Sequence, residues 1–255
     1  MPNASLPDWE KVLTSAAHLQ RILPEAVLVG GTAAALYAGH RFSADADHVL
    51  PDLAQRFDRV LADLECVAGW KTARVQRPVQ ILGKLDGIET GVRQLIRDEP
   101  LETTRIERLG MTVVVPTQEE MLRIKGVLML QRNATRDYLD FAALARHMGD
   151  EKVLGAFRSF DRLYPQPNDE SALQQLQIQL ANALPYDLEG FNLAEYKQLE
   201  PRWHDWRTVK AACADCANLL FARGEELEAA RESGEREDRV HQGGEGLGLE
   251  LGDED

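Results

Sequence analysis

Two carboxylates at alternate positions, Asp45 and Asp47, are the side chains of this sequence best placed to do chemistry. Side chains two residues apart on a strand point to the same face of a sheet, so these two would project side by side. Like charges held that close repel each other unless a cation lies between them. Hard divalent ions bind carboxylate oxygens together with the oxygens of a substrate phosphate. The pair therefore predicts a site for Mg²⁺ (or Mn²⁺) and a nucleotide.

A pair of glycines, Gly30 and Gly31, precedes the carboxylates and directly follows the apolar run 27–29. Glycines where a strand meets a helix let backbone N–H groups approach a phosphate, and the helix N-terminus adds a favourable dipole. The pattern GxxxxGK[ST] is absent from the sequence, so this is not a P-loop. A tight turn followed by an acidic surface strand is the alternative, but the two features in this order favour nucleotide binding.

A second group of charged residues lies between positions 125 and 140. Lys125 and Asp140 are each about two helical turns from the turn that joins two predicted helices, so they could lie level across an antiparallel pair. Arg132 shares a helix face with Lys125, and Arg136 shares one with Asp140. One lysine and two arginines could neutralise a triphosphate. A solvated helical hairpin with ion pairs is the alternative interpretation.

These residues need a scaffold, and the sequence predicts an α/β (α+β) fold with a mixed sheet. Hydrophobic periodicity and turn residues predict helices at 8–23 (with Asp8 as N-cap), 32–39 and 52–67, and strands at 26–29, 45–50, 79–82, 88–95, 103–109 and 111–115. Thr117 and Glu120 form a capping box for a helix to about residue 131, and further helices are expected near 133–148, 151–163, 170–183 and 202–222. We expect an α/β domain at 1–116, a helical domain at 117–224 that completes the nucleotide site, and an acidic, disordered tail at 225–255.

Composition and charge narrow the classes of protein. The 255-residue chain has a formal net charge of −13, but residues 225–255 hold 12 of the acidic and 3 of the basic residues, leaving 30 acidic and 26 basic residues elsewhere. A body this close to neutral does not indicate a long nucleic-acid-binding surface. No segment approaches the ~20 apolar residues of a membrane span, and the N-terminus lacks the features of a signal peptide. We therefore expect a cytoplasmic protein without a membrane partner.

The motifs GGTAAALYAGHRFSADAD at 30–47 and K-x₆-R-x₃-RD-x₂-D at 125–140 resemble those of the AbiEii family of nucleotidyltransferase toxins. That family includes the mycobacterial MenT toxins and belongs, more distantly, with the DNA polymerase β-like nucleotidyltransferases. The resemblance covers about residues 27–144. It implies a polymerase β-like nucleotidyltransferase domain with a mixed sheet, followed by a helical C-terminal domain. It also implies transfer of a nucleoside monophosphate from an NTP to an acceptor, in some members the 3′ end of tRNA, and an antitoxin partner.

The resemblance assigns roles to individual residues. Gly30 and Gly31 match the glycine turn that binds the nucleotide, and Asp45 and Asp47 match the metal-binding pair. Lys125 matches the lysine that contacts the nucleotide, and Asp140 matches the later active-site aspartate. Ser43 matches a small hydroxyl residue that some members carry as a site of inhibitory phosphorylation.

Two departures from the wider superfamily are visible. A third carboxylate is usual on a neighbouring strand, and Asp86 and Glu89 are the candidates here, although neither has a motif around it. The second glycine replaces a serine, so any hydroxyl contact would have to come from Thr32.

Other functions stay open at this point. The acceptor could be a small molecule or a protein hydroxyl instead of RNA, or the chain could be a regulatory module that binds nucleotide without turnover. Cys213 and Cys216 are interpreted as small residues on a helix face rather than as a metal or redox pair. Trp203 and Trp206 are interpreted as anchors for the last helix, with base stacking as the alternative.

Overall fold

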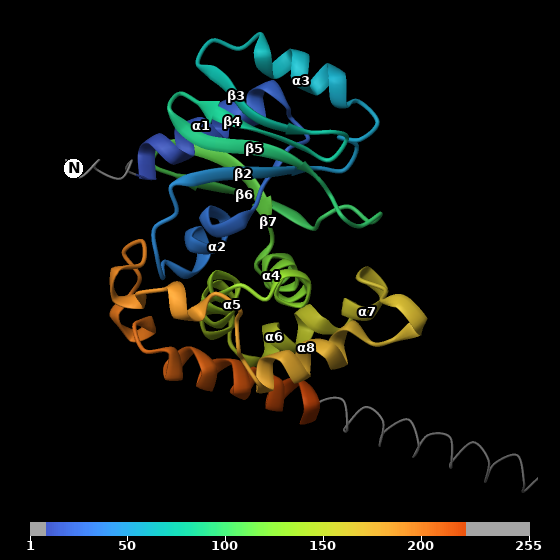
Figure 1. Cartoon of the computed structure of the whole chain (residues 1–255), viewed down its shortest axis with the longest axis vertical. Coiled ribbons are helices and arrows are strands. Elements are labelled where there is room, and N and C mark those ends of the chain that lie inside the picture. Colours follow the sequence, from blue (N-terminus) through green and yellow to red (C-terminus); the bar gives the residue numbers. More distant parts are fainter. Residues whose placement is uncertain (1–8, 223–255) are drawn as a thin grey trace, which may run out of the picture.

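The computed structural model describes residues 9–222, with the strands in one half of the molecule and most of the helices in the other (Figure 1). The predicted Asp8 cap and the predicted acidic tail at 225–255 lie outside the described residues. All the strands of the described part end by Pro116, and the residues after it are helical or irregular. The division at residue 116 follows this change, although it stays a prediction that the two halves are separate domains.

A five-stranded mixed sheet carries the first motif. Its order is β1 (Val27–Leu28), β2 (Asp45–Leu50), β5 (Ile88–Gln94), β4 (Gln80–Leu85) and β3 (Trp70–Gln76). β2 and β5 run parallel, whereas the other neighbouring strands are antiparallel. The mixed sheet predicted from the sequence is confirmed.

One face of this sheet is covered by α1 (Trp9–Ile22) and α3 (Phe57–Glu65), whose apolar side chains form a cluster with those of β4 and β5. Burial alternates along β2, because Ala46, His48 and Leu50 point into the interior whereas Asp45 and Asp47 are partly exposed on the other face. The alternation is what the two-residue period of a strand requires. It turns both carboxylates away from the apolar core.

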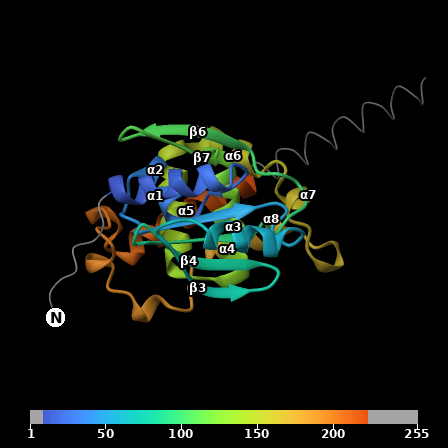
Figure 2. The same ribbon diagram turned by 90° about the horizontal axis from the view of Figure 1, so that it is seen from above.

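A separate hairpin of β6 (Thr103–Arg108) and β7 (Met111–Pro116) packs against α1 at the side of the main sheet (Figure 2). The amide of Gln20 on α1 donates to the Val114 carbonyl and accepts from its N–H, both at 2.8 Å. Through these two bonds, a side chain of α1 pairs with the backbone of β7 on the edge that β6 does not cover. They hold β7 against α1 just before the chain enters the helical half.

An antiparallel pair, α4 (Gln118–Arg132) and α5 (Thr135–Met148), begins the helical half. Thr117 caps α4 by accepting from the Glu120 N–H at 3.2 Å, and Asn133, with φ 43°, ends it in the left-handed conformation. Around the pair lie α6 (Asp150–Phe157), α7 (Phe160–Leu163), α8 (Ala172–Ala181) and a helix over residues 206–222. The largest apolar cluster contains side chains from α1, α2 (Gly30–Ala38) and these helices, so it joins the two halves.

Several details differ from the sequence-based expectation, among them the following three. β3 was not predicted, because after Trp70 its side chains are all exposed and it shows no alternating pattern. α3 begins at Phe57 rather than near residue 52, since residues 51–56 form turns held by the Gln94 side chain. The expected helix at 151–163 is divided into α6 and α7.

Candidate active site

Asp45 and Asp47 lie on the open face of β2 and line a cavity of about 650 Å³ between the sheet and the helices. The volume lies within the ~300–1,000 Å³ usual for small-ligand sites. Asp45 accepts from the Ser43 hydroxyl at 3.3 Å and lies 3.4 Å from the Lys197 ammonium. Within the described residues, no hydrogen bond or close ion pair involves the Asp47 carboxylate. Burial and the neighbouring Asp45 raise the pKa of Asp47, partly offset by Arg93, Arg136 and Arg132.

The register of β5 decides between the two candidates for a third carboxylate. Glu89 pairs directly with Asp45 across the parallel strands and lines the cavity, with its carboxylate 3.3 Å from Lys84. Asp86 lies in the turn between β4 and β5, 2.8 Å from His18, and does not line the cavity. Opposite Asp47 stands Gly91, where a Cβ would lie 2.5 Å from Leu82. Of the two candidates, only Glu89 shares a face with the carboxylate pair.

The glycine turn lies next to the carboxylates, and a side chain at either glycine would be unfavourable there. Gly30 has φ +74°, a conformation that side chains disfavour, and a Cβ there would point at Asp47. A Cβ at Gly31 would lie 2.2 Å from Nη2 of Arg41 and 2.8 Å from the Ser43 hydroxyl. The absence of a side chain at Gly31 therefore makes room for the Arg41 guanidinium. Thr32 is buried and donates its hydroxyl to the Asp45 carbonyl at 2.5 Å, so it fixes the backbone of β2.

A buried cluster of charges lies on the helical side of the cavity. The Lys125 ammonium is 2.7 Å from Asp140 and 3.3 Å from Asp137, and these side chains are at most 1% exposed. Arg41 donates to both carboxylate oxygens of Asp140, at 2.7 and 3.0 Å, and His40 lies 2.7 Å from the same group. The antiparallel α4–α5 pair thus brings Lys125 and Asp140 level, as their spacing from the turn predicted.

Electrostatics keep the Asp140 carboxylate of this cluster ionised. Burial alone would raise the pKa of Asp140, but attraction by Arg41 and Lys125 and the contact with His40 hold that pKa well below its usual range. Arg132 donates to Asp137 at 2.5 and 2.7 Å. Three cations, Arg41, Lys125 and Arg132, therefore share two carboxylates. The excess positive charge borders the cavity that holds Asp45 and Asp47.

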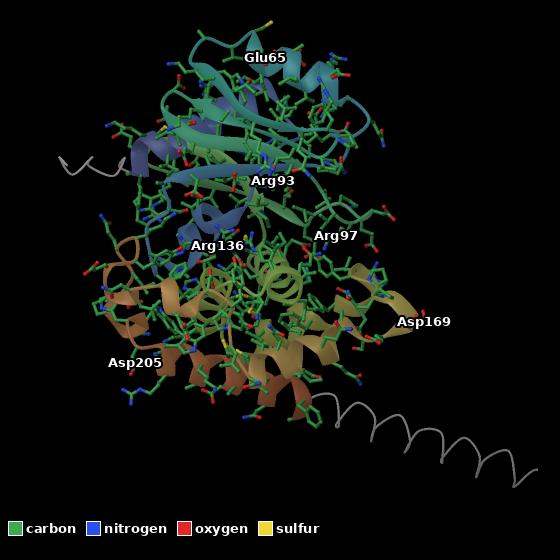
Figure 3. All side chains as sticks on the ribbon, viewed as in Figure 1. Glu65, Arg93, Arg97, Arg136, Asp169 and Asp205 are labelled. Carbon is green, nitrogen blue, oxygen red and sulfur yellow. The ribbon has the colours of Figure 1, made fainter. Side chains whose placement is uncertain are left out.

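More cations approach the cavity from both halves of the molecule. Arg93 on β5 lies on the sheet side and Arg136 on α5 on the helical side (Figure 3), and both line the cavity. Lys197 and Tyr196 complete the polar wall from a loop after α8. The rest of the cavity is lined mainly by apolar side chains, among them Leu95, Ile96, Leu101, Ile124, Leu128 and Tyr164. The cationic side chains of the lining thus suit phosphate groups, whereas the apolar ones suit a flat ring.

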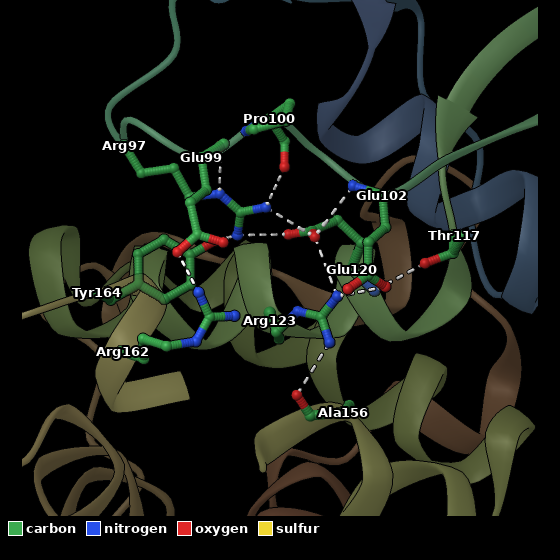
Figure 4. A network of polar contacts seen from close by, with 10 residues as sticks. All are labelled: Arg97, Glu99, Pro100, Glu102, Thr117, Glu120, Arg123, Ala156, Arg162 and Tyr164. Carbon is green, nitrogen blue, oxygen red and sulfur yellow. Dashed lines mark hydrogen bonds and ion pairs between the residues drawn. The ribbon is translucent and has the colours of Figure 1, made fainter. Parts of the chain in front are cut away.

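A buried polar network holds the apolar wall in place (Figure 4). Glu120 is fully buried and accepts from Arg97 at 2.9 Å, from Arg123 at 3.0 Å and from the Glu102 N–H at 3.3 Å. The hydroxyl of Tyr164 accepts from Arg97 at 3.1 Å. The network ties the connection between β5 and β6 to α4 and to the end of α7. The Glu120 carboxylate therefore belongs to this network and does not accept from the Thr117 N–H, which donates to the Glu102 carbonyl instead. Of the predicted capping box, only the bond from the Glu120 N–H to the Thr117 hydroxyl is formed.

Sequence reasoning missed several residues of the site. His40, Arg41 and Asp137 stand inside the two motifs, but no periodicity or spacing marked them. The sequence feature related to Arg41 is the glycine at position 31, whose missing side chain leaves space for the Arg41 guanidinium. That relationship is visible only in the folded chain. Arg93 and Lys197 lie outside the motifs and reach the cavity through the sheet register and a distant loop.

The carboxylate pair fits a hard divalent cation. Asp47 is a partly exposed carboxylate that lacks a hydrogen-bond donor among the described residues, and it lies beside a second carboxylate. Within residues 9–222, no group of three or more His, Cys, Asp or Glu is arranged to hold a metal. Mg²⁺ is commonly held by one or two carboxylates, with water and substrate phosphates as its other ligands. Two carboxylates facing an open, cation-lined cavity match that donor set better than a closed zinc site.

The weaker sequence signals lie elsewhere. Cys213 is buried in the largest apolar cluster and Cys216 is partly buried beside it, both with free thiols. Trp203 is almost fully buried, and the Trp206 ring meets Tyr138 edge-on at 5.9 Å. Their packing matches the interpretation as anchors of the last helix. Considering the described residues alone, no helix is both long and apolar enough to cross a membrane.

The fold and the cavity define an α/β protein in which a carboxylate pair faces a group of cations across one cavity. The chain belongs to the family described as nucleotidyl transferase AbiEii toxin, type IV TA system, which matches residues 12–215. It is therefore a nucleotidyltransferase of a toxin–antitoxin family. The family, the fold class and the enzyme class predicted from the sequence are confirmed.

The chain is also similar to known structures and to curated proteins. JHP933 from Helicobacter pylori is similar with a TM-score of 0.50 and 18% sequence identity, covering 89% of this chain and 100% of its own. At that identity the likeness shows the fold alone. The heme uptake protein MmpL11 of Mycobacterium tuberculosis (strain ATCC 25618 / H37Rv) is 31% identical over 128 residues, which are 49% of this chain. The match spans only 13% of the length of MmpL11.

Proposed function

We propose that this chain transfers a nucleoside monophosphate from an NTP to a hydroxyl of an RNA acceptor, the 3′ end of tRNA, as the toxin of a toxin–antitoxin pair. The observation that carries the proposal is the placement of Asp45 and Asp47 opposite the cations of α4 and α5 across one cavity. A carboxylate pair and a triphosphate-sized group of cations are the two requirements of nucleotidyl transfer. The family supplies the toxin–antitoxin context.

In the proposed reaction, the acceptor hydroxyl attacks the α-phosphate in line with the departing pyrophosphate. The new bond joins the acceptor oxygen to phosphorus, the bond to the β-phosphate oxygen breaks, and the hydroxyl proton passes to solvent. Mg²⁺ bound at Asp45 and Asp47 would supply charge neutralisation at the attacking and leaving oxygens. Nucleotidyltransferases are typically metal-dependent, in agreement with this donor set.

The chain's own residues position the triphosphate. The glycine turn at 30–31 offers backbone N–H groups at the start of α2, next to both carboxylates. Arg132 and Arg136 line the cavity and neutralise phosphate charge. Lys125 and Arg41 contribute from the buried cluster. Asp140 has cations on both carboxylate oxygens and a depressed pKa, so it orients Lys125 and Arg41 rather than taking a proton.

Support for an RNA acceptor comes from the surface next to the cavity. Tyr186 is 76% exposed, and its N–H donates to the Asn133 carbonyl at 3.1 Å. Asn133 directly follows Arg132, which lines the cavity. Exposed aromatic rings can bind single-stranded nucleic acid by stacking on its bases. A ring in this position would hold the unpaired end of an RNA acceptor.

The test is incubation of the full chain with each α-phosphate-labelled NTP and Mg²⁺, with and without total tRNA. We expect label to appear in tRNA, together with release of pyrophosphate. Label on a protein or a small molecule would replace the RNA acceptor while keeping the enzyme class. Nucleotide-dependent thermal stabilisation without pyrophosphate release would instead indicate a regulatory module and contradict the proposal.

A further inference from the structure

The loop that brings Lys197 into the cavity has an unfavourable backbone. Lys197 has φ 41° and Gln198 has φ 54°, so two consecutive residues other than glycine adopt the left-handed conformation. Side chains disfavour this region because the Cβ approaches the following carbonyl. Such residues persist where surrounding contacts impose the conformation, and they are common at functional sites.

Backbone hydrogen bonds impose the turn. The Lys197 carbonyl accepts from the Phe42 N–H at 2.8 Å, and the His40 carbonyl accepts from the Glu200 N–H at 2.7 Å. The segment 40–42 leads directly into β2 and carries Arg41, whose guanidinium lies 5.7 Å from the centre of the Tyr196 ring. The turn is therefore attached to the loop that positions the active-site carboxylates.

The turn places the Lys197 side chain in an ion pair with Asp45. The Lys197 ammonium lies 3.4 Å from Oδ1 of Asp45, and each side chain is 38% exposed. Partly exposed ion pairs of this kind are weak because solvent screens them. Lysine has a flexible four-carbon stem and a compact charge, so its ammonium can leave Asp45 while the backbone stays fixed.

A divalent cation at Asp45 and the Lys197 ammonium exclude each other there, because like charges at the same carboxylate oxygen repel strongly. Within reach of the lysine stem, the triphosphate of a bound NTP is the anion that would replace Asp45 as its partner. We propose that Lys197 is a mobile counter-ion, which occupies Asp45 in the free protein and moves to the nucleotide phosphates when metal and NTP bind together. The inference rests on the proposed function of Asp45 as a metal ligand.

The consequence is that metal binding depends on nucleotide. Without nucleotide, Lys197 competes with the metal for Asp45 and weakens its binding. With nucleotide, the same ammonium strengthens binding of the phosphates. Removing its charge should therefore have opposite effects on the two equilibria, which loss of folding or of a general structural contact would not produce.

The test compares Lys197→Met with the parent chain and with Lys152→Met, a control at an exposed lysine of α6. Binding of Mn²⁺ alone is measured by electron paramagnetic resonance, and binding of a non-hydrolysable NTP analogue in the presence of Mg²⁺ by calorimetry. We expect Lys197→Met to bind Mn²⁺ alone roughly two- to fivefold more tightly. We expect it to bind the analogue about tenfold more weakly. Lys197→Arg should retain most of the affinity for the analogue, and Lys152→Met should match the parent chain.

Two results would overturn the inference while leaving the proposed function intact. One is unchanged or weaker binding of Mn²⁺ alone by Lys197→Met, and the other is unchanged binding of the analogue. A parent chain that binds neither Mn²⁺ nor the analogue would contradict the proposed function, and the inference with it. The binding measurements on the parent chain thus separate the two failures.

Discussion

The Lys125 ammonium lies 2.7 Å from Oδ2 of Asp140, and neither side chain is more than 1% exposed. A buried lysine between two carboxylates is costly unless each charge is compensated, and here Arg41 and Arg132 join Lys125 in compensating Asp140 and Asp137. The cluster therefore holds its charges in fixed positions beside the cavity. Fixed charges of this kind favour a transition state because they need no reorganisation during the reaction.

Replacement of Asp140 should destabilise the protein. Asp140→Asn removes the negative charge that Arg41, Lys125 and His40 share, so the buried Arg41 guanidinium loses its ion pair and Lys125 keeps only the one with Asp137. Breaking a buried ion pair in this way typically costs about 3–5 kcal/mol. Urea unfolding measures the loss. Asp63→Asn, in an exposed pair with Arg59, is the matched control and should change stability by less than about 1 kcal/mol. Equal effects of the two variants would argue against the buried cluster.

Gly31→Ala should reduce nucleotide binding more than it reduces stability. The added Cβ would lie 2.2 Å from Nη2 of Arg41, so the guanidinium would have to leave its place between Gly31 and Asp140. We expect a loss of roughly tenfold or more in affinity for an NTP analogue, since charge-assisted contacts are displaced. Gly155→Ala in α6, where a Cβ meets nothing within 4 Å, should leave binding unchanged and stabilise the helix slightly. Unchanged binding by Gly31→Ala would contradict the role of the Arg41 position.

Loss of the exposed Tyr186 ring should weaken binding of the RNA acceptor and leave binding of NTP unchanged. Tyr186→Ala removes a side chain that is 76% exposed next to the α4–α5 turn, and we expect the KM for tRNA to rise about tenfold. The KM for NTP should stay unchanged, because the ring is outside the nucleotide cavity. Phe221→Ala, at a ring 59% exposed on the last helix, provides the comparison and should change neither value. A rise in both KM values for Tyr186→Ala would instead indicate a structural effect.

The three cysteine thiols should differ in their rates of alkylation between pH 7 and 9. Burial, with a smaller contribution from Asp215, raises the pKa of Cys216 to about 12, and burial likewise raises the pKa of Cys213. A thiol with such a pKa is ionised only at a level of ~10⁻⁴ near pH 8, and the thiolate is the reactive form. Between pH 7 and 9, alkylation should therefore modify the exposed Cys66 and spare the other two until the chain unfolds. Mass spectrometry of labelled peptides measures this. Rapid labelling of Cys216 in the folded protein would reopen a redox or metal role for the pair.

The sequence was most informative where side chains obey a short period. Asp45–Leu50 is predicted with its observed bounds, because its alternation of acidic and apolar residues admits only one face to the core. The level placement of Lys125 and Asp140 also follows from counting helical turns. The metal and nucleotide roles of these residues stay predictions.

What the sequence could not supply depends on contacts between distant segments. Lys197 is 152 residues from Asp45, and nothing in its neighbourhood indicates a site. Arg41 has a place only because Gly31 lacks a side chain and Asp140 lies beyond it. β3 escaped notice because an exposed edge strand has no apolar alternation. These features become visible only when the chain is folded.

The most direct test of the account is transfer of label from an α-phosphate-labelled NTP to tRNA by the parent chain and by Asp45→Asn/Asp47→Asn. Both substitutions keep the size of the side chain and remove the charge that would bind metal, and Asp63→Asn again provides the control. We predict that the double variant folds and loses transfer by at least about 10³-fold, since charge stabilisation at a single catalytic position alone is worth that order. Transfer by the double variant at the rate of the parent chain would contradict the central claim.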